Sequence, residues 1–343
     1  MKALVYLGPH DLRYVDVDTP EPRAGEVLVR PRSVSICGSD LSGYKGGSAM
    51  RVPPLIMGHE FSGEIARLGS GVSGINVGDR VGVVTNLYCG ECRDCRDGLS
   101  NVCDNRFIIG TTMKAGSYNG AMADFVVAPA EKIMRLPDNV SFHECALVEP
   151  LSIALRATKH AGNLQGKTVA VFGSGPIGLL TIMCVRAFGA ERVIAIDMVD
   201  GRLKMARQCG ASDTINSRED VSMLAHRLTG NAGIDVVFDA AGVAATINSG
   251  IDIVRNGGTI VMIGLASPTF EIEYKHAVAK ELTLQGSYMY TSEMREGLQL
   301  IADGKLNVKQ IITSELPMSE GPRVFEELVS GKSSEIKVIL TNN

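Results

Sequence analysis

A strong excess of charge of either sign is missing from this sequence. The formal net charge is −4 at pH 7, which creates no field that would favour DNA, RNA or an anionic membrane. Internal repeats, low-complexity tracts and blocks of like charge are also missing. The apolar run within residues 1–7 is too short for a secretory signal. We therefore expect a cytoplasmic protein without a nucleic-acid or membrane partner.

A long segment without charge occurs once, at residues 168–185, and it has about the length of a membrane-spanning helix. The segment contains Gly173-Ser174-Gly175-Pro176, and a proline preceded by glycines would break such a helix. We therefore interpret the segment as a buried strand, a turn and a helix.

The composition is that of a globular chain with enough residues for two domains and a sizeable core. The chain has 343 residues, of which 45% are hydrophobic and 21% are charged, which are ordinary values. The 38 glycines indicate many turns and close approaches of the backbone to a ligand. The eight cysteines suit a reducing compartment better than a disulfide framework if some of them bind metal.

Four of the cysteines lie within fifteen residues, in the segment 89–103. Zinc in structural sites is bound by four thiolates in a tetrahedron, and short spacers allow a tight loop to direct the sulfurs at one point. A cage with four protein ligands leaves no open position, so we predict a structural zinc. The predicted ligands are Cys89, Cys92, Cys95 and Cys103.

Two other interpretations of this segment are weaker. Core cysteines would lie among apolar residues, whereas residues 89–103 are rich in Arg, Asp and Glu. A zinc module that binds nucleic acid needs positive charge, yet residues 91–106 carry three arginines against four carboxylates.

Residues 1 to about 150 read as β-rich, because short apolar runs alternate with Gly, Pro and Asp turns, which is typical of a barrel-like or sandwich core. This part contains Cys37 and, further on, His59 followed by Glu60. Thiolate, imidazole and carboxylate are ligands that zinc accepts, so the three residues are candidates for a second metal site. Spacing alone also allows a chance occurrence.

Glu149, which precedes Pro150, is a further candidate ligand, and Cys145 competes with it. A cysteine in the apolar context Glu144-Cys145-Ala146-Leu147 is more often a small core residue. A glutamate before proline is commonly a helix-start or surface residue, so the residues alone leave the role of Glu149 open.

The second half of the chain reads as a dinucleotide-binding domain. A buried strand at 168–172 is followed by the loop Gly173-Ser174-Gly175-Pro176-Ile177-Gly178 and then by a helix at 179–188. The first glycine allows the tight turn, the second lets a pyrophosphate approach, and the third lets helix and strand pack closely. The amino-terminal N–H groups of the helix then face the phosphates.

Asp197 ends the next predicted strand, residues 192–197, and can accept hydrogen bonds from the adenosine ribose hydroxyls. A 2′-phosphate at this place would be repelled by ~4 kcal/mol per charge pair, at about 4 Å and an effective dielectric of ~20. We therefore predict NAD rather than NADP. Arg202 would weaken this preference if it approached the phosphate.

The remaining apolar runs continue the same winding. Residues 234–238 and 259–263 have no alternation, as expected for strands buried on both faces of a parallel sheet. Residues 282–287 read as the last strand of this sheet. Residues 293–302 and 321–330 read as amphipathic helices, and residues 336–340 as a final strand.

The order of these motifs resembles the zinc-dependent medium-chain dehydrogenases. Cys37-Gly-Ser-Asp, Gly58-His-Glu, the four-cysteine segment, Glu149-Pro and the glycine-rich loop follow one another as they do in that family. The resemblance covers essentially the whole chain. It is closest for the polyol branch, which contains sorbitol, xylitol, galactitol-phosphate and idonate dehydrogenases, with threonine dehydrogenase nearby.

The resemblance implies an α/β protein of two domains. A GroES-like β-rich catalytic domain would comprise residues 1–155 and 291–343 and carry the structural zinc lobe, and a Rossmann domain with a doubly wound parallel sheet would comprise residues 156–290. Zinc and the nicotinamide of NAD would meet in the cleft between the domains. The edge strand at 282–287 would pair with its counterpart in a homodimer or homotetramer.

The resemblance also implies a ligand set for a catalytic zinc. Cys37 and His59 would bind the ion, and Glu60 and Glu149 would complete its shell directly or through water. In family members that act on primary alcohols, a cysteine stands near the position of Glu149. This difference favours a secondary alcohol as substrate.

Three more residues receive roles from the resemblance. Ser39 would sit against the substrate oxygen and pass its proton outward. Asp40 would orient His59, since a ligating imidazole usually donates its other N–H to a carboxylate or carbonyl. Tyr44 resembles the aromatic residue that lines the polyol pocket, although a half-buried loop tyrosine is equally compatible with the sequence.

The function that the resemblance implies is NAD-dependent oxidation of a secondary hydroxyl of a small-molecule polyol, a hexitol or pentitol, to the ketose. A threonine-type amino-alcohol dehydrogenase is the main alternative, and Glu149 would then receive the ammonium group. A zinc-free quinone reductase would not need Cys37, His59 and Glu60 together. A phosphorylated polyol would need converging cations, for which Lys45, Arg51 and Lys114 are candidates.

Overall fold

The computed structural model describes residues 1–342. The chain forms two compact units, which are described one after the other. Unit 1 comprises residues 1–149, 294–302 and the chain from Ile312 onward, and unit 2 comprises Pro150–Glu293 and Asp303–Ile311. The segment Asp303–Ile311 therefore clusters with unit 2, whereas we expected all residues from 291 onward to join the first domain.

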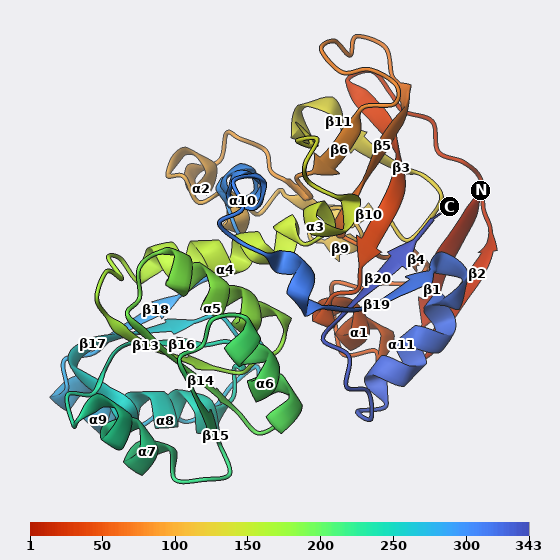
Figure 1. Ribbon diagram of the computed structural model, residues 1–343. Helices are drawn as coiled ribbons and strands as arrows, with labels where there is room; N and C mark the ends of the chain where they lie inside the picture. Colours follow the sequence, from red (N-terminus) through yellow and green to blue (C-terminus); the bar gives the residue numbers. More distant parts are fainter. Residues whose placement is uncertain (343) are drawn as a thin grey trace. The chain divides into compact units, whose positions relative to one another are not determined.

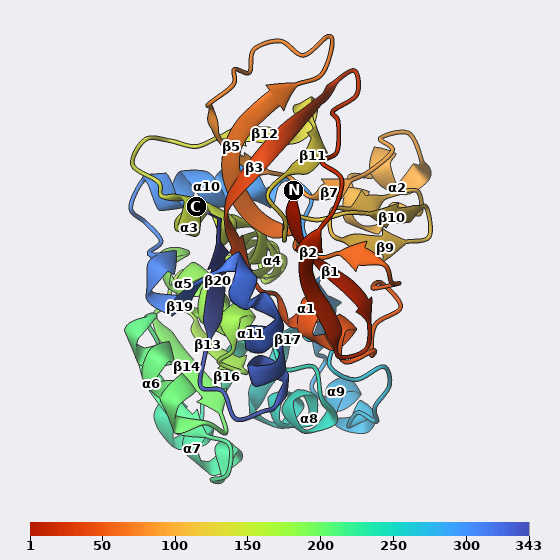
Figure 2. The ribbon, with the colours of Figure 1, turned by 90° about the vertical axis from the view of Figure 1, so that its right-hand side faces the viewer.

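Unit 1 is built on a seven-stranded sheet and a three-stranded sheet (Figures 1 and 2). The larger sheet has the order β12-β6-β5-β3-β20-β19, with β11 also paired to β3, and the smaller has the order β2-β1-β4. The last strand of the chain pairs antiparallel with β3, so unit 1 is discontinuous in sequence. The strands of the two sheets are β1 Lys2–Gly8, β2 Asp11–Asp16, β3 Glu26–Ser35, β4 Leu55–Ile56, β5 Glu60–Leu68, β6 Arg80–Val83, β11 Val126–Pro129, β12 Ile133–Arg135, β19 Ile312–Pro317 and β20 Lys337–Thr341.

Helices and short hairpins complete unit 1. α11 packs beside α1 and β2 (Figure 2), and an apolar core that includes Leu4, Tyr6, Met57 and Phe325 fills the space between the elements. The bounds are α1 Gly38–Tyr44, α2 Arg93–Arg96, α3 Phe142–Ala146, α10 Glu293–Ala302, α11 Gly321–Val329, β7 Asn86–Leu87, β8 Phe107–Ile108, β9 Thr111–Met113 and β10 Gly116–Tyr118.

Unit 2 contains a six-stranded parallel sheet with helices on both faces (Figure 1). Its order, β15-β14-β13-β16-β17-β18, is the doubly wound Rossmann arrangement, in which the direction of winding reverses at the first strand. The fold class expected from the sequence is confirmed. The elements are α4 Val148–His160, β13 Thr168–Phe172, α5 Pro176–Ala187, β14 Arg192–Asp197, α6 Asp200–Gln208, β15 Asp213–Asn216, α7 Val221–Thr229, β16 Ile234–Asp239, α8 Ala244–Ile253, β17 Val254–Met262, α9 Tyr274–Ala279 and β18 Thr283–Gly286.

The uncharged run at 168–185 divides into β13, a glycine-rich turn and α5, as interpreted from its Gly and Pro residues. Residues 169–172 are fully buried, because a central parallel strand is covered on both faces. Among the described residues, none of the helices has the length and apolar character that a membrane crossing would require.

Candidate metal centres and dinucleotide site

The structure brings Cys37, His59 and Glu60 together at one end of β3 and β5 in unit 1. The thiol, an imidazole nitrogen and a carboxylate oxygen of these residues all lie within 4.8 Å of one another. The end of β3 pairs antiparallel with the start of β5, with Ser35 opposite Glu60. Because Cys37 follows β3 and His59 precedes β5, this register places the two residues side by side.

The first turn of α1 holds Cys37 in place. Its Sγ accepts a hydrogen bond from the backbone N–H of Ser39 at 3.5 Å, and the carboxylate of Asp40 accepts the backbone N–H of Cys37 at 3.3 Å. This reciprocal arrangement is a capping box with a cysteine at its N-cap. Asp40 therefore serves the local backbone in addition to any role toward the imidazole.

Asp40 and Ser39 lie close to different ring nitrogens of His59. Oδ1 of Asp40 is 3.5 Å from Nδ1, and Oγ of Ser39 is 3.5 Å from Nε2. Burial alone would raise the pKa of Asp40, but the charges of His59 and Arg51 and the hydrogen bonds of Arg51 hold this pKa below its usual value. The carboxylate is therefore ionised and faces the nitrogen that a metal would leave free.

A buried lysine that the sequence analysis missed completes this cluster. Nζ of Lys337, on β20, lies 2.5 Å from Oε2 of Glu60 and donates to the carbonyl oxygen of Ile36 at 3.0 Å. Its side chain is 2% exposed and that of Glu60 is 1% exposed. The sequence could have indicated a buried charge here, because Lys337 is the only charged residue of the predicted strand Ile336-Lys337-Val338-Ile339-Leu340.

Glu149 also lies in unit 1 and is buried, and one of its oxygens, Oε2, has no hydrogen-bond partner. Its pKa is raised to about 8, mainly by burial and further by the negative charges of Glu60 and Cys37, against the opposing effects of His59 and Lys337. Burial, followed by the charge of Glu60, raises the pKa of Cys37 to about 12. Burial and the negative charge of neighbouring groups thus both oppose the ionisation of Cys37 and Glu149.

These residues fit a divalent metal ion. Thiolate, imidazole and carboxylate are the donors of zinc sites, and a cation at this place would stabilise the ionised forms of Cys37, Glu60 and Glu149. Cys37, His59 and Glu60 form the compact donor group, while Glu149 offers the oxygen without a partner.

Two neighbouring residues make their contacts outside the cluster of Cys37, His59 and Glu60. Tyr44 is 4% exposed within the apolar core of unit 1, and its hydroxyl donates to Glu326 at 2.9 Å while its ring packs against Phe325. These contacts place Tyr44 in the core, and its role as a pocket-lining residue stays a prediction. Cys145 packs so closely on Gly82 that a Cβ there would clash with its sulfur, so it is a core residue, as its apolar context suggested.

The three cations considered for a substrate phosphate differ in their burial and in their ion pairs. Arg51 is 3% exposed and forms an ion pair with Asp40 at 2.7 Å. Lys114 is exposed and pairs with Asp104 at 3.3 Å. Lys45 is exposed next to the end of α1. The burial of Arg51 could not be read from the sequence, because it depends on contacts with Asp40 and Gly43.

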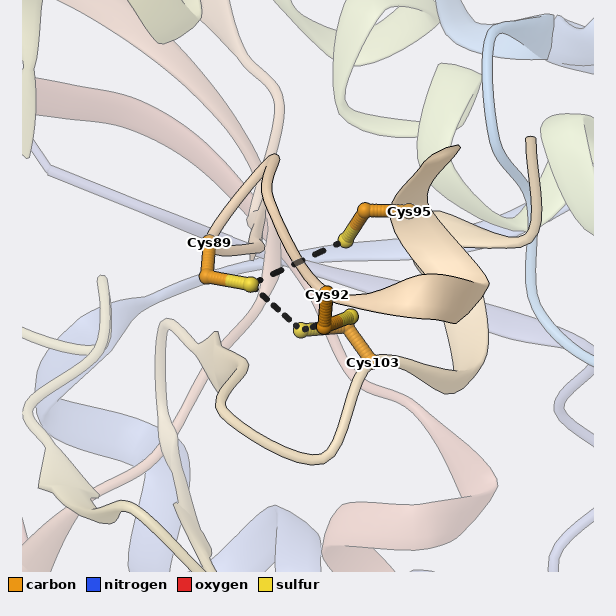
Figure 3. Close-up of side chains that lie close together, drawn as sticks. All are labelled: Cys89, Cys92, Cys95 and Cys103. Carbon is orange, nitrogen blue, oxygen red and sulfur yellow. Dashed lines mark hydrogen bonds between the residues drawn. The ribbon is translucent and has the colours of Figure 1, made fainter. Parts of the chain in front are cut away.

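The four cysteines of the lobe direct their sulfurs at one point (Figure 3). The sulfur of Cys89 lies 3.5 Å from that of Cys103 and 4.0 Å from that of Cys95, and the sulfurs of Cys92 and Cys103 are 3.8 Å apart. Four thiolates at about 2.3 Å from a zinc ion would lie about 3.8 Å from one another in a tetrahedron. The backbone N–H groups of Glu91 and Cys92 lower the pKa of Cys89 to about 6. The donor set therefore fits a closed structural zinc site.

Replacing Cys92 with serine tests this site. A serine hydroxyl is a poor zinc ligand, so the variant should contain one zinc ion fewer per chain than the wild type and melt ~5–10 °C lower. Metal analysis and thermal unfolding measure both effects. Cys145→Ala removes a buried thiol from the same unit and should keep the full metal content. An unchanged zinc content of Cys92→Ser would contradict the assignment.

The glycine-rich loop of unit 2 has the geometry of a phosphate-binding turn. Gly173 has a φ of +86°, and a Cβ on Gly178 would clash with the carbonyl oxygen of Gly173. Gly175 is the N-cap of α5, Pro176 and Ile177 open its first turn, and the space beside Gly175 is open. These features fit a dinucleotide whose pyrophosphate lies at the amino end of α5.

Asp197 ends β14 and is held against this loop. Its carboxylate accepts the backbone N–H groups of Ser174 at 2.7 Å and of Val199 at 2.9 Å. Each oxygen keeps a second lone pair that a ribose hydroxyl can use. Arg202 lies in the first turn of α6 and is exposed.

Comparisons with known proteins agree with this architecture. Residues 23–138 match the model of the alcohol dehydrogenase GroES-like domain, and residues 176–303 match the model of the zinc-binding dehydrogenase domain. A probable D-xylulose reductase A of Aspergillus fumigatus is 35% identical over 340 residues, which cover 96% of this chain and 94% of that protein.

Two solved structures from Escherichia coli are also similar over the whole length. Galactitol-1-phosphate dehydrogenase has a TM-score of 0.92 and 28% identity and covers 100% of both chains. An alcohol dehydrogenase in complex with NADH has a TM-score of 0.91 and 27% identity and covers 100% of this chain and 99% of its own. With the glycine-rich loop of unit 2 and the metal-binding residues of unit 1, these likenesses show that the chain belongs to the zinc-dependent medium-chain dehydrogenases, in their polyol branch.

Proposed function

We propose that this protein oxidises a secondary hydroxyl of a sugar alcohol to the ketose with NAD as cofactor. The observation that carries the proposal is the cluster of Cys37, His59 and Glu60, with the hydroxyl of Ser39 within 3.5 Å of the imidazole. The probable D-xylulose reductase that is 35% identical to this chain is named for the reduction of a ketose, which is the reverse of the proposed reaction.

Cys37 and His59 would hold the catalytic zinc, with Glu60 and Glu149 as further oxygen donors. When bound, zinc favours the alkoxide form of the substrate over the alcohol. The effect is on the order of 12 kcal/mol if the pKa of the hydroxyl falls by ~9 units, as that of zinc-bound water does. NAD is the hydride acceptor. The chain itself orients these groups. Ser39 would take the proton of the substrate hydroxyl and give its own hydroxyl proton to solvent water, which can reach this half-buried side chain. Asp40 keeps a hydrogen on Nδ1 of His59 so that Nε2 can bind metal.

Asp197 supports NAD over NADP. Its two oxygens are fixed by backbone N–H groups, so the carboxylate cannot turn away from a 2′-phosphate. Repulsion between the two charges would then act at full strength, at ~4 kcal/mol per charge pair. Arg202 would have to approach the phosphate to offset this repulsion.

A threonine-type amino-alcohol dehydrogenase is the second candidate, because the buried oxygen of Glu149 without a hydrogen-bond partner would suit an ammonium group. A screen for NADH formation with hexitols, pentitols, their phosphates and threonine separates the candidates. We expect kcat/KM for the best free alditol to exceed that for threonine by at least ~100-fold, which corresponds to about 2.7 kcal/mol of transition-state binding. A preference for threonine, or activity confined to primary alcohols, would refute the polyol proposal.

The assembly and location are also proposals. β18 is the last strand of the sheet of unit 2 in the described part of the chain, so its outer edge is available to a second copy, and we propose a homodimer or homotetramer. Sedimentation of the purified protein measures this state. All eight cysteines are free thiols, which agrees with a reducing compartment such as the cytoplasm.

A further inference from the structure

Arg51 is a buried cation beside the candidate zinc site, and the proposed function gives it no role. It lies in the loop between α1 and β4 and is 3% exposed. Its Nε and Nη2 atoms lie 3.2 Å and 2.7 Å from Oδ1 of Asp40, and Nη1 donates to the carbonyl oxygen of Met50 at 3.1 Å. These three contacts fix the orientation of its planar guanidinium group.

The same guanidinium also reaches Ser39. Nη2 donates to Oγ of Ser39 at 3.1 Å. An arginine has only donors and stays protonated, so the hydroxyl of Ser39 must be the acceptor in this contact. The hydroxyl hydrogen of Ser39 takes no part in this contact, so Ser39 can donate it to another acceptor. Arg51 thus sets the direction of the hydrogen bond at the residue proposed to carry the substrate proton.

Arg51 and Asp40 both lie next to Nδ1 of His59. Both hydrogens of Nη2 are engaged by Ser39 and Asp40, and Nδ1 of His59 lies 3.5 Å from Nη2 and 3.5 Å from Oδ1 of Asp40. Since a guanidinium cannot accept a hydrogen bond, the carboxylate is the only acceptor of this pair. A hydrogen on Nδ1 would therefore be accepted by Asp40, which would leave the lone pair of Nε2 for a metal ion.

The surroundings hold Arg51 in this position. A Cβ on Gly43 would clash with the Cγ atom of Arg51, so the glycine leaves the room that the side chain occupies. The carbonyl oxygen of Met50, which accepts from Arg51, also accepts the backbone N–H of Thr112 at 2.9 Å. The loop that carries the arginine is therefore tied to β9.

We propose that Arg51 is a positioning residue of the dehydrogenase reaction. It holds Ser39 as a hydrogen-bond acceptor and Asp40 against His59, so that the proton of the substrate hydroxyl leaves through Ser39. This proposal depends on the proposed function only in requiring an alcohol whose proton leaves through Ser39. The polyol screen of the wild type tests the substrate class separately. If the screen selects a different alcohol, the experiment on Arg51 uses that alcohol.

A double-mutant cycle with Ser39 tests the proposal in the zinc-loaded protein. Arg51→Lys keeps the charge beside Asp40 but loses the forked donors, so we expect kcat to fall ~10–30-fold and the solvent deuterium isotope effect on kcat to rise. Ser39→Ala should lower kcat by ~100-fold, as expected for loss of a proton-transfer group. Because Arg51 acts through Ser39, adding Arg51→Lys to Ser39→Ala should change kcat less than ~3-fold.

Measurements without turnover separate positioning from general damage. Arg51→Lys should keep the wild-type zinc content and a melting temperature within a few degrees of the wild type. Arg32→Lys is the matched control, because Arg32 pairs with Glu64 at 2.9 Å in the same unit, and it should leave both kcat and the isotope effect unchanged. If Arg51→Lys does not fold, Gly43→Ala provides the same test, since it displaces the side chain of Arg51 without removing its charge.

Two results would overturn the proposal. One is a kcat of Arg51→Lys, or of Gly43→Ala, that equals that of the wild type. The other is a double variant in which the two losses multiply, because the arginine would then act independently of Ser39.

Discussion

Cys37→Ala is expected to lower kcat by at least ~10³-fold while the dissociation constant for NADH stays within about threefold of the wild-type value. Cys37 supplies the only thiolate of the cluster with His59 and Glu60, and a zinc site left with an imidazole and a carboxylate binds its ion much more weakly. NADH binding depends on the glycine-rich loop of unit 2, which the substitution does not touch. The zinc content should fall by one ion per chain.

Cys145→Ala is the control for Cys37→Ala. It removes a thiol that is also buried in unit 1 and has no ligand role, so it should keep the activity and both zinc ions. NADH titration followed by fluorescence and metal analysis on the same samples give the comparison. A Cys37→Ala variant with near wild-type turnover would show that the chemistry occurs elsewhere, and one that loses NADH binding would show that the substitution disturbs the whole chain.

Much of unit 2 was predictable from the sequence because its signals are local. A strand buried on both faces needs a run of apolar residues, as in residues 169–172 and 236–238. A turn that must accommodate a φ of +86° needs a glycine such as Gly173. In unit 1, the helix at 293–302 and the strand at 336–340 were also predicted within a residue of their observed bounds, since the spacing of their apolar residues is a local signal.

The details of the metal site in unit 1 were less predictable because they depend on contacts between distant residues. The donors Cys37 and His59 could be suggested from residue type and motif order. The contact of Lys337 with the carbonyl oxygen of Ile36 spans 301 positions, and no local pattern specifies it. The contacts of Arg51 and Tyr44 were not predictable for the same reason, since their partners Asp40 and Glu326 follow from the packing of α1 against its neighbours.

Lys337→Met should destabilise the zinc-free protein by ~3–5 kcal/mol, because it leaves the buried carboxylate of Glu60 without its ion-pair partner beside two other acidic groups. Zinc at the Cys37 site would supply positive charge of its own, so the loss of stability should be smaller in the zinc-loaded protein. Zinc should therefore stabilise the variant more than it stabilises the wild type. Urea unfolding of loaded and chelator-treated samples measures both differences. Lys337→Met combined with Glu60→Gln should recover most of the lost stability, since the unpaired charge is then gone. Equal instability of the single and double variants would show that Lys337 contributes through packing alone.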